Sequence, residues 1–308
     1  MTARTKAHLA LLAVALIYGL NYIVAKEVMP KYILPRGFIF MRVVGASALF
    51  FILSVFVKSK QKIERKDWFR VLLCGVFGVA SNQLLFFEGL NLTTPINAAV
   101  IMTVNPVLVL VMSAILLKET MGKWRILGVI LGAAGALILI LGKGEISLLN
   151  SDTELGNLFI FFNAASYAVY LVIVKPLMRK YDALLVIKWV FAAGMIFVIP
   201  AGIGQFSAIE WTAFTPTVTA QVLFVVVCTT FLAYLFNVYA LKTLTSSTVS
   251  IYIYLQPLFA TSVALMLGKD ILTFRALVAA ALIFIGVYLV SFKKPGSYSK
   301  PEGNSGTD

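Results

Sequence analysis

The amino-acid sequence predicts an all-α, polytopic membrane protein with ten transmembrane helices in two inverted-topology repeats of five helices. Three observations lead to this fold class. Of the 308 residues, 60% are hydrophobic and 13% are charged, which is about half the charged share of a soluble domain. Charge-free runs long enough to cross a bilayer recur along the chain. The two halves of the chain also match each other at a nearly constant offset.

The composition excludes several other classes of protein. A mean hydropathy of +0.94 is too high for a soluble domain, whose surface needs more charge than this chain offers. A net charge of +13 would suit nucleic-acid binding in a soluble protein, but the basic residues here lie between apolar runs and anchor helices at anionic membrane surfaces. We therefore expect a lipid bilayer as partner and no nucleic acid. Cys74 and Cys228 lie in apolar runs and are expected to be buried thiols.

Each apolar run is expected to form one spanning helix, because about 20 residues at about 1.5 Å per residue cross the hydrocarbon core. The first run is expected to be retained, since Tyr18, Gly19 and Asn21 interrupt it and no small-residue cleavage site follows. Turn-rich segments at 91–95 and 243–247 divide two longer uncharged stretches. The predicted spans are 7–26, 37–57, 71–90, 96–117, 126–142, 155–174, 183–204, 220–241, 247–267 and 275–292.

The distribution of basic residues predicts the orientation in the cell (inner) membrane. With the N-terminus inside, the inner segments hold 18 of the 26 Lys and Arg residues and the outer loops hold 6, the others being Arg42 and Lys188 within spans. The positive-inside rule then places both termini in the cytoplasm. Residues 293–308 are rich in Gly, Ser, Pro and charge and are expected to form a disordered cytoplasmic tail.

An internal repeat divides the rest of the chain into residues 1–145 and 146–292. The segment 18–32 matches 167–181 at an offset of 149, sharing Tyr18 with Tyr167. A later block matches at an offset of 151, pairing Pro106 with Pro257 and Gly135 with Gly286. Because five spans is an odd number, the second repeat must enter the membrane upside down. Such inverted repeats are typical of secondary transporters.

These motifs make the sequence resemble the drug/metabolite transporter superfamily, and within it the ten-helix proteins with two EamA domains. The residues that carry the resemblance are Tyr18-Gly19-Leu20-Asn21 with Lys26, Arg42, the stretch Gly89-Leu90 to Ala98-Ala99, and Pro106…Lys118-Glu119 repeated as Pro257…Lys269-Asp270. The resemblance implies that helices 1–4 and 6–9 surround a central cavity while helices 5 and 10 pack as a scaffold. The second half departs from the pattern, with Ala168 at the position of Gly19 and no clear partner for Arg42.

Polar and aromatic residues within the spans are candidates for a substrate site. Asn97 and Asn105 share one helix face, and their repeat partners are Thr248 and Gln256. A polar face is costly in lipid, so these faces should look into the bundle. There they either line a cavity or form hydrogen bonds that join helices. The full candidate set is Asn21, Tyr22, Asn82, Gln83, Asn97, Asn105, Tyr167, Tyr170, Tyr234, Asn237, Thr248, Tyr252 and Gln256.

Two prolines are candidates for a gating or hinge role. Pro106 and Pro257 each remove a backbone donor in mid-span and weaken the helix where a substrate would lie. The alternative is a kink that serves packing alone. Small residues on spans 5 and 10, including Gly128, Gly132 and Gly135 with Ala276, Ala280 and Gly286, are expected to permit close helix approach.

Three charged residues fall within predicted spans. Arg42 and Glu88 lie at similar depth near the outer ends of spans 2 and 3, so we expect a charge pair between them. Glu88 is the one acidic residue in a span and hence the candidate for proton coupling. The alternative is an interfacial acid that neutralises an arginine. Lys188 is expected to reach the lipid headgroups.

The function predicted from these features is secondary-active transport of a small metabolite by alternating access. The resemblance favours export of amino acids or related amphiphilic metabolites and drugs, by a monomer without a cofactor. An antiporter of phosphorylated or sugar-nucleotide substrates is the alternative, although it should need more basic cavity groups than Arg42 and Lys188. A channel or receptor would need a filter or a soluble domain. An intramembrane enzyme is excluded because His8 and one membrane acid assemble neither a metal site nor an acid/base pair.

The orientation can be tested by single-cysteine labelling in a background that lacks Cys74 and Cys228. A cysteine at Ser59, in the loop 58–70, should resist an impermeant thiol reagent in intact cells and react only after permeabilisation. A cysteine introduced between residues 143 and 154 is the matched control and should react in intact cells. Labelling of position 59 from outside would overturn the assignment.

Overall fold

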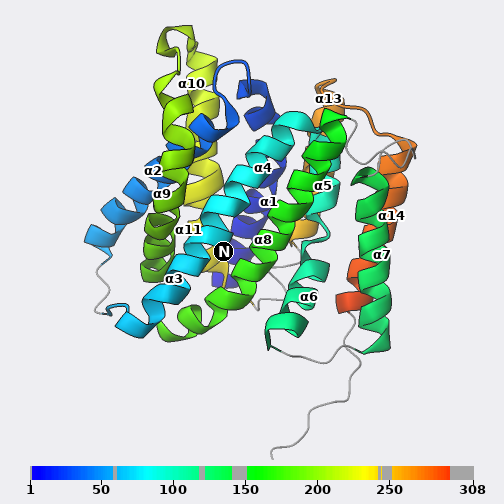
Figure 1. Ribbon diagram of the computed structural model, residues 1–308, viewed down its shortest axis with the longest axis horizontal. Helices are drawn as coiled ribbons and strands as arrows, with labels where there is room; N and C mark the ends of the chain where they lie inside the picture. Colours follow the sequence, from blue (N-terminus) through cyan, green and yellow to red (C-terminus); the bar gives the residue numbers. More distant parts are fainter. Residues whose placement is uncertain are drawn as a thin grey trace, which may run out of the picture.

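The structure is a computed structural model that describes residues 2–57, 61–117, 122–140, 151–241, 244 and 252–291. This part of the chain is helical and contains no strand (Figure 1). Seven helical segments are long and apolar enough to cross a membrane, and the segments Leu255–Met266 and Phe274–Leu289 are shorter apolar helices. The prediction of an all-helical membrane protein is therefore confirmed. The tail and residues 141–150 lie outside the described part.

Most helices begin and end within a few residues of the predicted spans, whereas predicted span 247–267 is described only from residue 252 and contains a shorter α-helix. The first half contains α1 (Ala3–Val28), α2 (Pro35–Phe56), α3 (Trp68–Gly75), α4 (Ser81–Leu92), α5 (Pro95–Met102), α6 (Asn105–Leu117) and α7 (Lys123–Ile140). The second half contains α8 (Asp152–Lys180), α9 (Ala183–Ser207), α10 (Pro216–Leu223), α11 (Ala233–Leu241), α13 (Leu255–Met266) and α14 (Phe274–Ser291). Predicted spans 3, 4 and 8 are each built from two α-helices rather than one.

Local sequence signals explain where several helices begin. Pro95 and Pro216 occupy the first turns of α5 and α10, where the missing N–H of proline costs nothing. The preceding Thr94 and Thr215 cap these helices, since each hydroxyl accepts a hydrogen bond from a backbone N–H three residues later. Ser151 caps α8 in the same way. These capping residues and prolines determine where the three helices begin.

The same interruptions occur in both halves. A 3₁₀ turn precedes α3 (Arg65–Asp67, η1) and another precedes α10 (Trp211–Ala213, η3). Each of these helices then runs through a π-helical segment, Val76–Ala80 (η2) before α4 and Phe224–Leu232 (η4) before α11. A π segment widens the helix and is frequent at functional sites. The two halves therefore share an order of elements that their amino-acid similarity indicated only in part.

Side-chain contacts give the relative directions of the helices. Tyr22 on α1 packs edge-on against Phe86 on α4, and Lys26 binds the C-terminal end of α4, so α1 and α4 run parallel. Asn82 near the start of α4 bonds to Asn163 on α8, and Thr93 directly after α4 bonds to Asn157, nearer the start of α8, so α4 and α8 run antiparallel. It follows that α8 runs opposite to α1, the helix with which it aligns in sequence.

Helices α7 and α14 lie side by side at one edge of the bundle (Figure 1). Glycines make this contact close: a Cβ at Gly286 would lie 2.6 Å from the Gly128 carbonyl oxygen and 2.7 Å from the Gly132 nitrogen. A Cβ at Gly135 would lie 2.7 Å from Ile283 Cγ1. The expected close packing of these small-residue stripes is confirmed, and it leaves the other helices to surround the interior.

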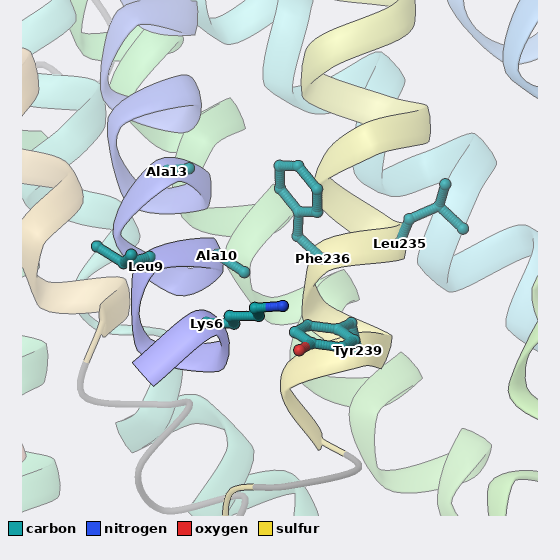
Figure 2. Close-up of a pocket in the computed structure, with 7 residues that line it drawn as sticks. All are labelled: Lys6, Leu9, Ala10, Ala13, Leu235, Phe236 and Tyr239. Carbon is teal, nitrogen blue, oxygen red and sulfur yellow. The ribbon is translucent and has the colours of Figure 1, made fainter. Parts of the chain in front are cut away.

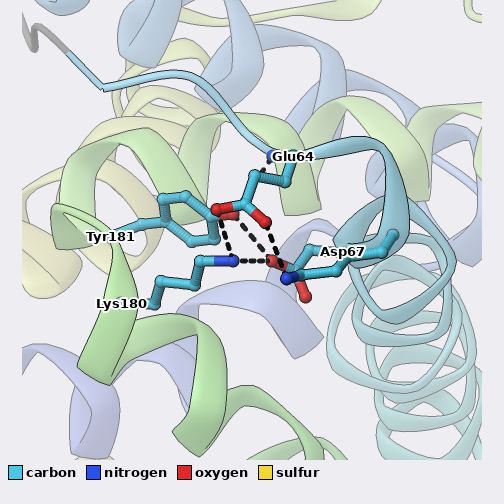
Figure 3. A network of polar contacts seen from close by, with 5 residues as sticks. Glu64, Asp67, Lys180 and Tyr181 are labelled. Carbon is cyan, nitrogen blue, oxygen red and sulfur yellow. Dashed lines mark hydrogen bonds and ion pairs between the residues drawn. The ribbon is translucent and has the colours of Figure 1, made fainter.

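An ion-pair network joins the two halves beside the C-terminal end of α8 (Figure 3). Because α8 is antiparallel to α4, this is the end of the bundle opposite Lys26. Lys180 at the end of α8 pairs with Glu64 (2.7 Å) and Asp67 (2.8 Å) beside η1. The Tyr181 hydroxyl also donates to Asp67 (2.7 Å). Hydrogen bonds from Lys180, and then from Lys66, lower the pKa of the Glu64 carboxyl, so it is ionised at neutral pH.

The close contact between α7 and α14 predicts a specific stability effect. Gly286→Ala places a methyl group against helix backbone that cannot yield, and should cost about 1–3 kcal/mol. Gly204→Ala is the matched control, because nothing lies within 4 Å of its added Cβ. Alanine lowers the conformational entropy of the unfolded chain, so this variant should be slightly more stable than the wild type. Thermal melting of the purified variants measures both. Equal melting temperatures would contradict the packing described.

Candidate functional site

Five tyrosines from three helices lie inside the bundle, and two of them, Tyr18 and Tyr234, are near the guanidinium of Arg42. Tyr22 is near Tyr18, and Tyr167 and Tyr170 are near both Tyr18 and Tyr234. Three of the rings stay partly accessible, whereas Arg42 is only 7% exposed. This tyrosine–arginine cluster consists of Tyr18 and Tyr22 on α1, Arg42 on α2, Tyr167 and Tyr170 on α8, and Tyr234 on α11.

Neutral groups hold the arginine in place. Arg42 Nε donates a hydrogen bond to Thr230 Oγ1 (2.6 Å). Its guanidinium carbon lies 5.3 Å from the centre of the Phe87 ring, within the range of a cation–π interaction. No acidic side chain of the described residues forms an ion pair with Arg42. The cluster therefore carries a net positive charge.

Both π segments shape the cluster. Thr230, which binds Arg42, belongs to the segment η4. Gly78 belongs to η2, and a Cβ at this position would overlap the Tyr170 ring, so only glycine leaves room for that ring. Because the two segments occupy matching positions in the two halves, the interruptions that break helical regularity coincide with the cluster.

Two predicted amides join helices instead of facing the cluster. Asn105 Nδ2 donates to the Ala164 carbonyl (2.9 Å), and Asn82 exchanges side-chain to backbone bonds with Asn163. These bonds attach α6 and α4 to α8. Of the two alternatives for these residues, the structure thus favours helix association over cavity lining.

Asn21 and Gln83 behave differently from the amides that join helices. Both are buried, at 3% and 4% exposure. Within the part of the chain that the structure describes, neither Asn21 Oδ1 nor Gln83 Oε1 has a hydrogen-bond donor. A buried acceptor without a donor is costly, so these two oxygens are available to a bound molecule.

The remaining polar candidates are dispersed. Asn237 bonds to the Ala233 carbonyl in its own helix (2.9 Å). The Tyr252 hydroxyl lies 2.8 Å from Nδ1 of His8, near the start of α1. Gln256 and Asn97 are half-buried, and Thr248 lies outside the described residues.

The two prolines stand at the start of helices. Pro106 follows the turn formed by Thr103 and Val104, which separates α5 from α6. Pro257 lies in the first turn of α13, directly after the 3₁₀ turn Tyr252–Tyr254 (η5). Each proline therefore marks a real interruption of the predicted span. Each half therefore contains two kinds of helical break, a π segment and a proline-marked turn.

The expected pair between Glu88 and Arg42 does not form, and this prediction was wrong. Glu88 Oε1 instead pairs with Arg36 Nε (2.7 Å), two turns nearer the start of α2. Their side chains are 26% and 55% exposed, so the pair lies near the end of the bundle. The predicted depth of Glu88 in the membrane could not show which of the two arginines on α2 it pairs with. Lys188 lies over the rings of Phe51 and Trp189.

A second polar network closes the junction between α4 and α5. Lys26 Nζ donates hydrogen bonds to three carbonyl oxygens at the end of α4, those of Leu90 (2.9 Å), Asn91 (3.1 Å) and Thr93. Asp270 accepts from the Ile96 N–H at the start of α5 (2.9 Å). Lys269 pairs with Glu27 (3.0 Å). The motif residues Lys26, Lys269 and Asp270 thus stabilise helix ends, whereas Lys118 and Glu119 lie outside the described residues.

A groove of about 570 Å³ lies between α1 and α11, near the start of α1 (Figure 2). Its walls are mostly apolar, and the Lys6 side chain extends toward the Tyr239 ring. The same two helices carry Tyr18 and Tyr234 farther along. The lining residues are Lys6, Leu9, Ala10, Ala13, Leu235, Phe236 and Tyr239.

Three members of the site were not among the predicted residues. Tyr18 could have been found, because it matches Tyr167 in the internal repeat. Phe87 and Thr230 carry no comparable signal, since one is an ordinary apolar residue of a span and the other owes its orientation to a π segment.

The chain is similar to known transporters. The EamA-like transporter family model matches residues 5–141 and 154–292. An uncharacterized transporter of Archaeoglobus fulgidus is 28% identical over 94% of this chain and 99% of its own length. The uncharacterized transporter YyaM of Bacillus subtilis is 25% identical over 92% of this chain and 93% of its own. The WAT1-related protein At3g53210 of Arabidopsis thaliana is 25% identical over 94% and 86%.

A solved crystal structure also matches, with a TM-score of 0.61 and 16% identity over 94% of this chain and 98% of that one. At this identity the match supports the fold alone. The two family matches cover both halves of the chain and leave out little more than the segment between them and the tail. The chain is therefore a multi-pass membrane protein that belongs to the EamA-like transporter family, with one family repeat in each half.

Proposed function

We propose that this protein is a secondary-active carrier that exports a small amphiphilic metabolite by alternating access. The observation that carries the proposal is the tyrosine–arginine cluster, a polar and aromatic site inside the bundle to which both halves contribute. Its rings come from α1, α8 and α11, and its cation comes from α2. A substrate at this site would contact helices that are interrupted in both halves, which is the arrangement that inverted-repeat carriers use.

The helix directions support the proposed architecture of ten spans in two inverted repeats, residues 1–145 and 146–292. Helix α8 runs opposite to α1, its sequence counterpart, as argued from the contacts of α4. The π segments η2 and η4 recur at equivalent positions. Two halves with opposite direction and similar internal breaks can exchange conformations, so that one site faces each side of the membrane in turn.

The proposed orientation, with both termini in the cytoplasm, places the groove between α1 and α11 on the cytoplasmic side. The groove is mostly apolar and carries one amine, that of Lys6. It lies between the two helices that bear Tyr18 and Tyr234. An amphiphilic molecule could therefore enter along these helices from the inside, which is the side from which an exporter is loaded.

The proposal is tested with purified protein in liposomes loaded with a panel of amino acids and aromatic metabolites. Efflux of at least one compound should exceed that from protein-free liposomes and should be accelerated by the same compound outside. Absence of protein-dependent efflux across the panel, with folded protein verified, would count against a carrier.

The proline-marked breaks predict a transport defect. Pro106→Ala or Pro257→Ala permits a continuous helix through the break and should slow transport severalfold without lowering expression. Pro200→Ala is the matched control, because Pro200 is exposed within α9 and its change should leave the rate unchanged. Wild-type rates in both break variants would show that the breaks serve packing alone.

The placement of Glu88 predicts that it does not couple transport to protons. Glu88→Gln removes an exposed pair with Arg36 that contributes about 0–1 kcal/mol, so folded yield should stay near that of the wild type. Accumulation driven by a pH gradient should also persist. Arg36→Gln is the matched variant and should behave alike. Loss of gradient-driven accumulation in Glu88→Gln, with exchange at equal pH intact, would instead identify Glu88 as the coupling carboxylate.

A further inference from the structure

The charge of Arg42 has no counterpart in the part of the chain that the structure describes. The ion pairs in that part lie at the ends of the bundle, including the pair that Arg36 forms with Glu88. Arg42 itself is 7% exposed. Removing a guanidinium from water without a counterion is expensive. A site that keeps such a charge is suited to a ligand that brings the opposite charge.

The guanidinium also has unused hydrogen-bonding capacity. An arginine side chain has five N–H donors in a planar fork that matches the two oxygens of a carboxylate. In the described residues, its one hydrogen bond runs from Nε to Thr230 Oγ1. The Phe87 ring covers one face of the group without accepting such a bond. The terminal nitrogens thus remain for a ligand.

The surroundings indicate the rest of the ligand. The rings of Tyr167 and Tyr170 lie 5.6 Å apart on α8, and Tyr167 is partly accessible. A single cation balances one carboxylate, whereas a phosphate dianion would call for several basic groups. One helical turn before Phe87, Gln83 Oε1 is a buried acceptor without a donor, which suits a further N–H or O–H of the ligand.

We propose that the tyrosine–arginine cluster binds aromatic organic anions, with Arg42 holding the carboxylate and the tyrosines surrounding the ring. This assignment deepens the proposed function by naming the substrate class of its site. Binding can be measured without transport, so the two proposals can be judged separately.

Three small probes of similar size and different charge test the anion preference. Phenylacetate, phenylacetamide and phenethylamine share a ring and a two-carbon arm but carry negative, zero and positive charge. Phenylacetate should raise the melting temperature of the full-length protein in detergent in a saturable manner, and the other two should not. Stabilisation by the amide or the amine equal to that by phenylacetate would overturn the proposal.

Substitutions at the two arginines of α2 test the assigned residue. Arg42→Gln should weaken phenylacetate binding on the order of tenfold or more, as expected for a lost charged hydrogen bond. Arg36→Gln is the matched control and should bind as the wild type does. Unliganded Arg42→Gln should melt no lower than the wild type, because removal of a buried charge without an ion pair offsets the lost hydrogen bond to Thr230 and the lost contact with the Phe87 ring. Unchanged binding in Arg42→Gln would overturn the assignment.

Arg42→Lys keeps the test decisive if Arg42→Gln does not fold. Lysine retains the charge without the fork, so it should bind phenylacetate more weakly than the wild type while still preferring it to the amide. Phenylacetate binding equal to that of the wild type, or loss of the preference for the anion, would contradict the proposal.

Two further measurements separate this inference from its alternatives. Replacing gluconate by chloride in the buffer should not reproduce the phenylacetate effect, and a matching rise in melting temperature would show a site for inorganic anions instead. In liposomes, Arg42-independent transport of neutral or cationic metabolites would refute the anion assignment while leaving a carrier in place. Selective phenylacetate binding without transport of any metabolite would support the anion assignment and count against a carrier.

Discussion

Lipid offers no hydrogen-bond partner to a backbone group, so every interruption of a membrane helix must be compensated by the protein itself. The junction between α4 and α5 illustrates this constraint most directly. Lys26 satisfies three carbonyl groups at the end of α4, and Asp270 satisfies the first free N–H of α5. Each such group left bare in hydrocarbon would cost several kcal/mol. Charged residues at this junction therefore belong to the helix ends and not to the cluster.

The same constraint explains why the site lies where the helices are irregular. A regular helix uses all its backbone groups internally and presents side chains at a fixed period. The π segments depart from that period, and as a result Thr230 reaches Arg42 while Gly78 admits the Tyr170 ring. These departures are possible only in the protein interior, where neighbouring helices cover the widened turns. The π segments therefore both position the residues of the cluster and interrupt the helices.

Much of the fold could be predicted from the sequence, because a spanning helix is identified by an apolar run of about 20 residues. The length of such a run changes little when a single residue differs. The spans and the glycine contacts between α7 and α14 follow from such patterns. The site was less predictable. Tyr22, Tyr167, Tyr170 and Tyr234 were identified as polar rings within spans. Residue type alone could not tell Asn105, which joins helices, from Asn21, whose side-chain oxygen has no donor among the described residues.

The choice of arginine partner shows the limit most clearly. Arg36 and Arg42 lie on one helix, six residues apart, and Glu88 was assigned to the wrong one because depth along the sequence ignores side-chain reach. Long side chains near a helix end extend toward water, so Glu88 meets the outer arginine. The inner arginine is left with neutral neighbours, and its charge becomes a property of the site instead of a structural pair.

That unpaired charge has a consequence for a carrier cycle. If a monoanion occupies the cluster, the local charge falls from plus one when empty to zero when loaded. Moving an unbalanced charge between two surroundings costs more than moving a neutral pair, since the desolvation of a lone ion is not repaid. The loaded site would then exchange between the two sides more readily than the empty one. A binding residue without a protein counterion thus links ligand recognition to the conformational step through electrostatics alone.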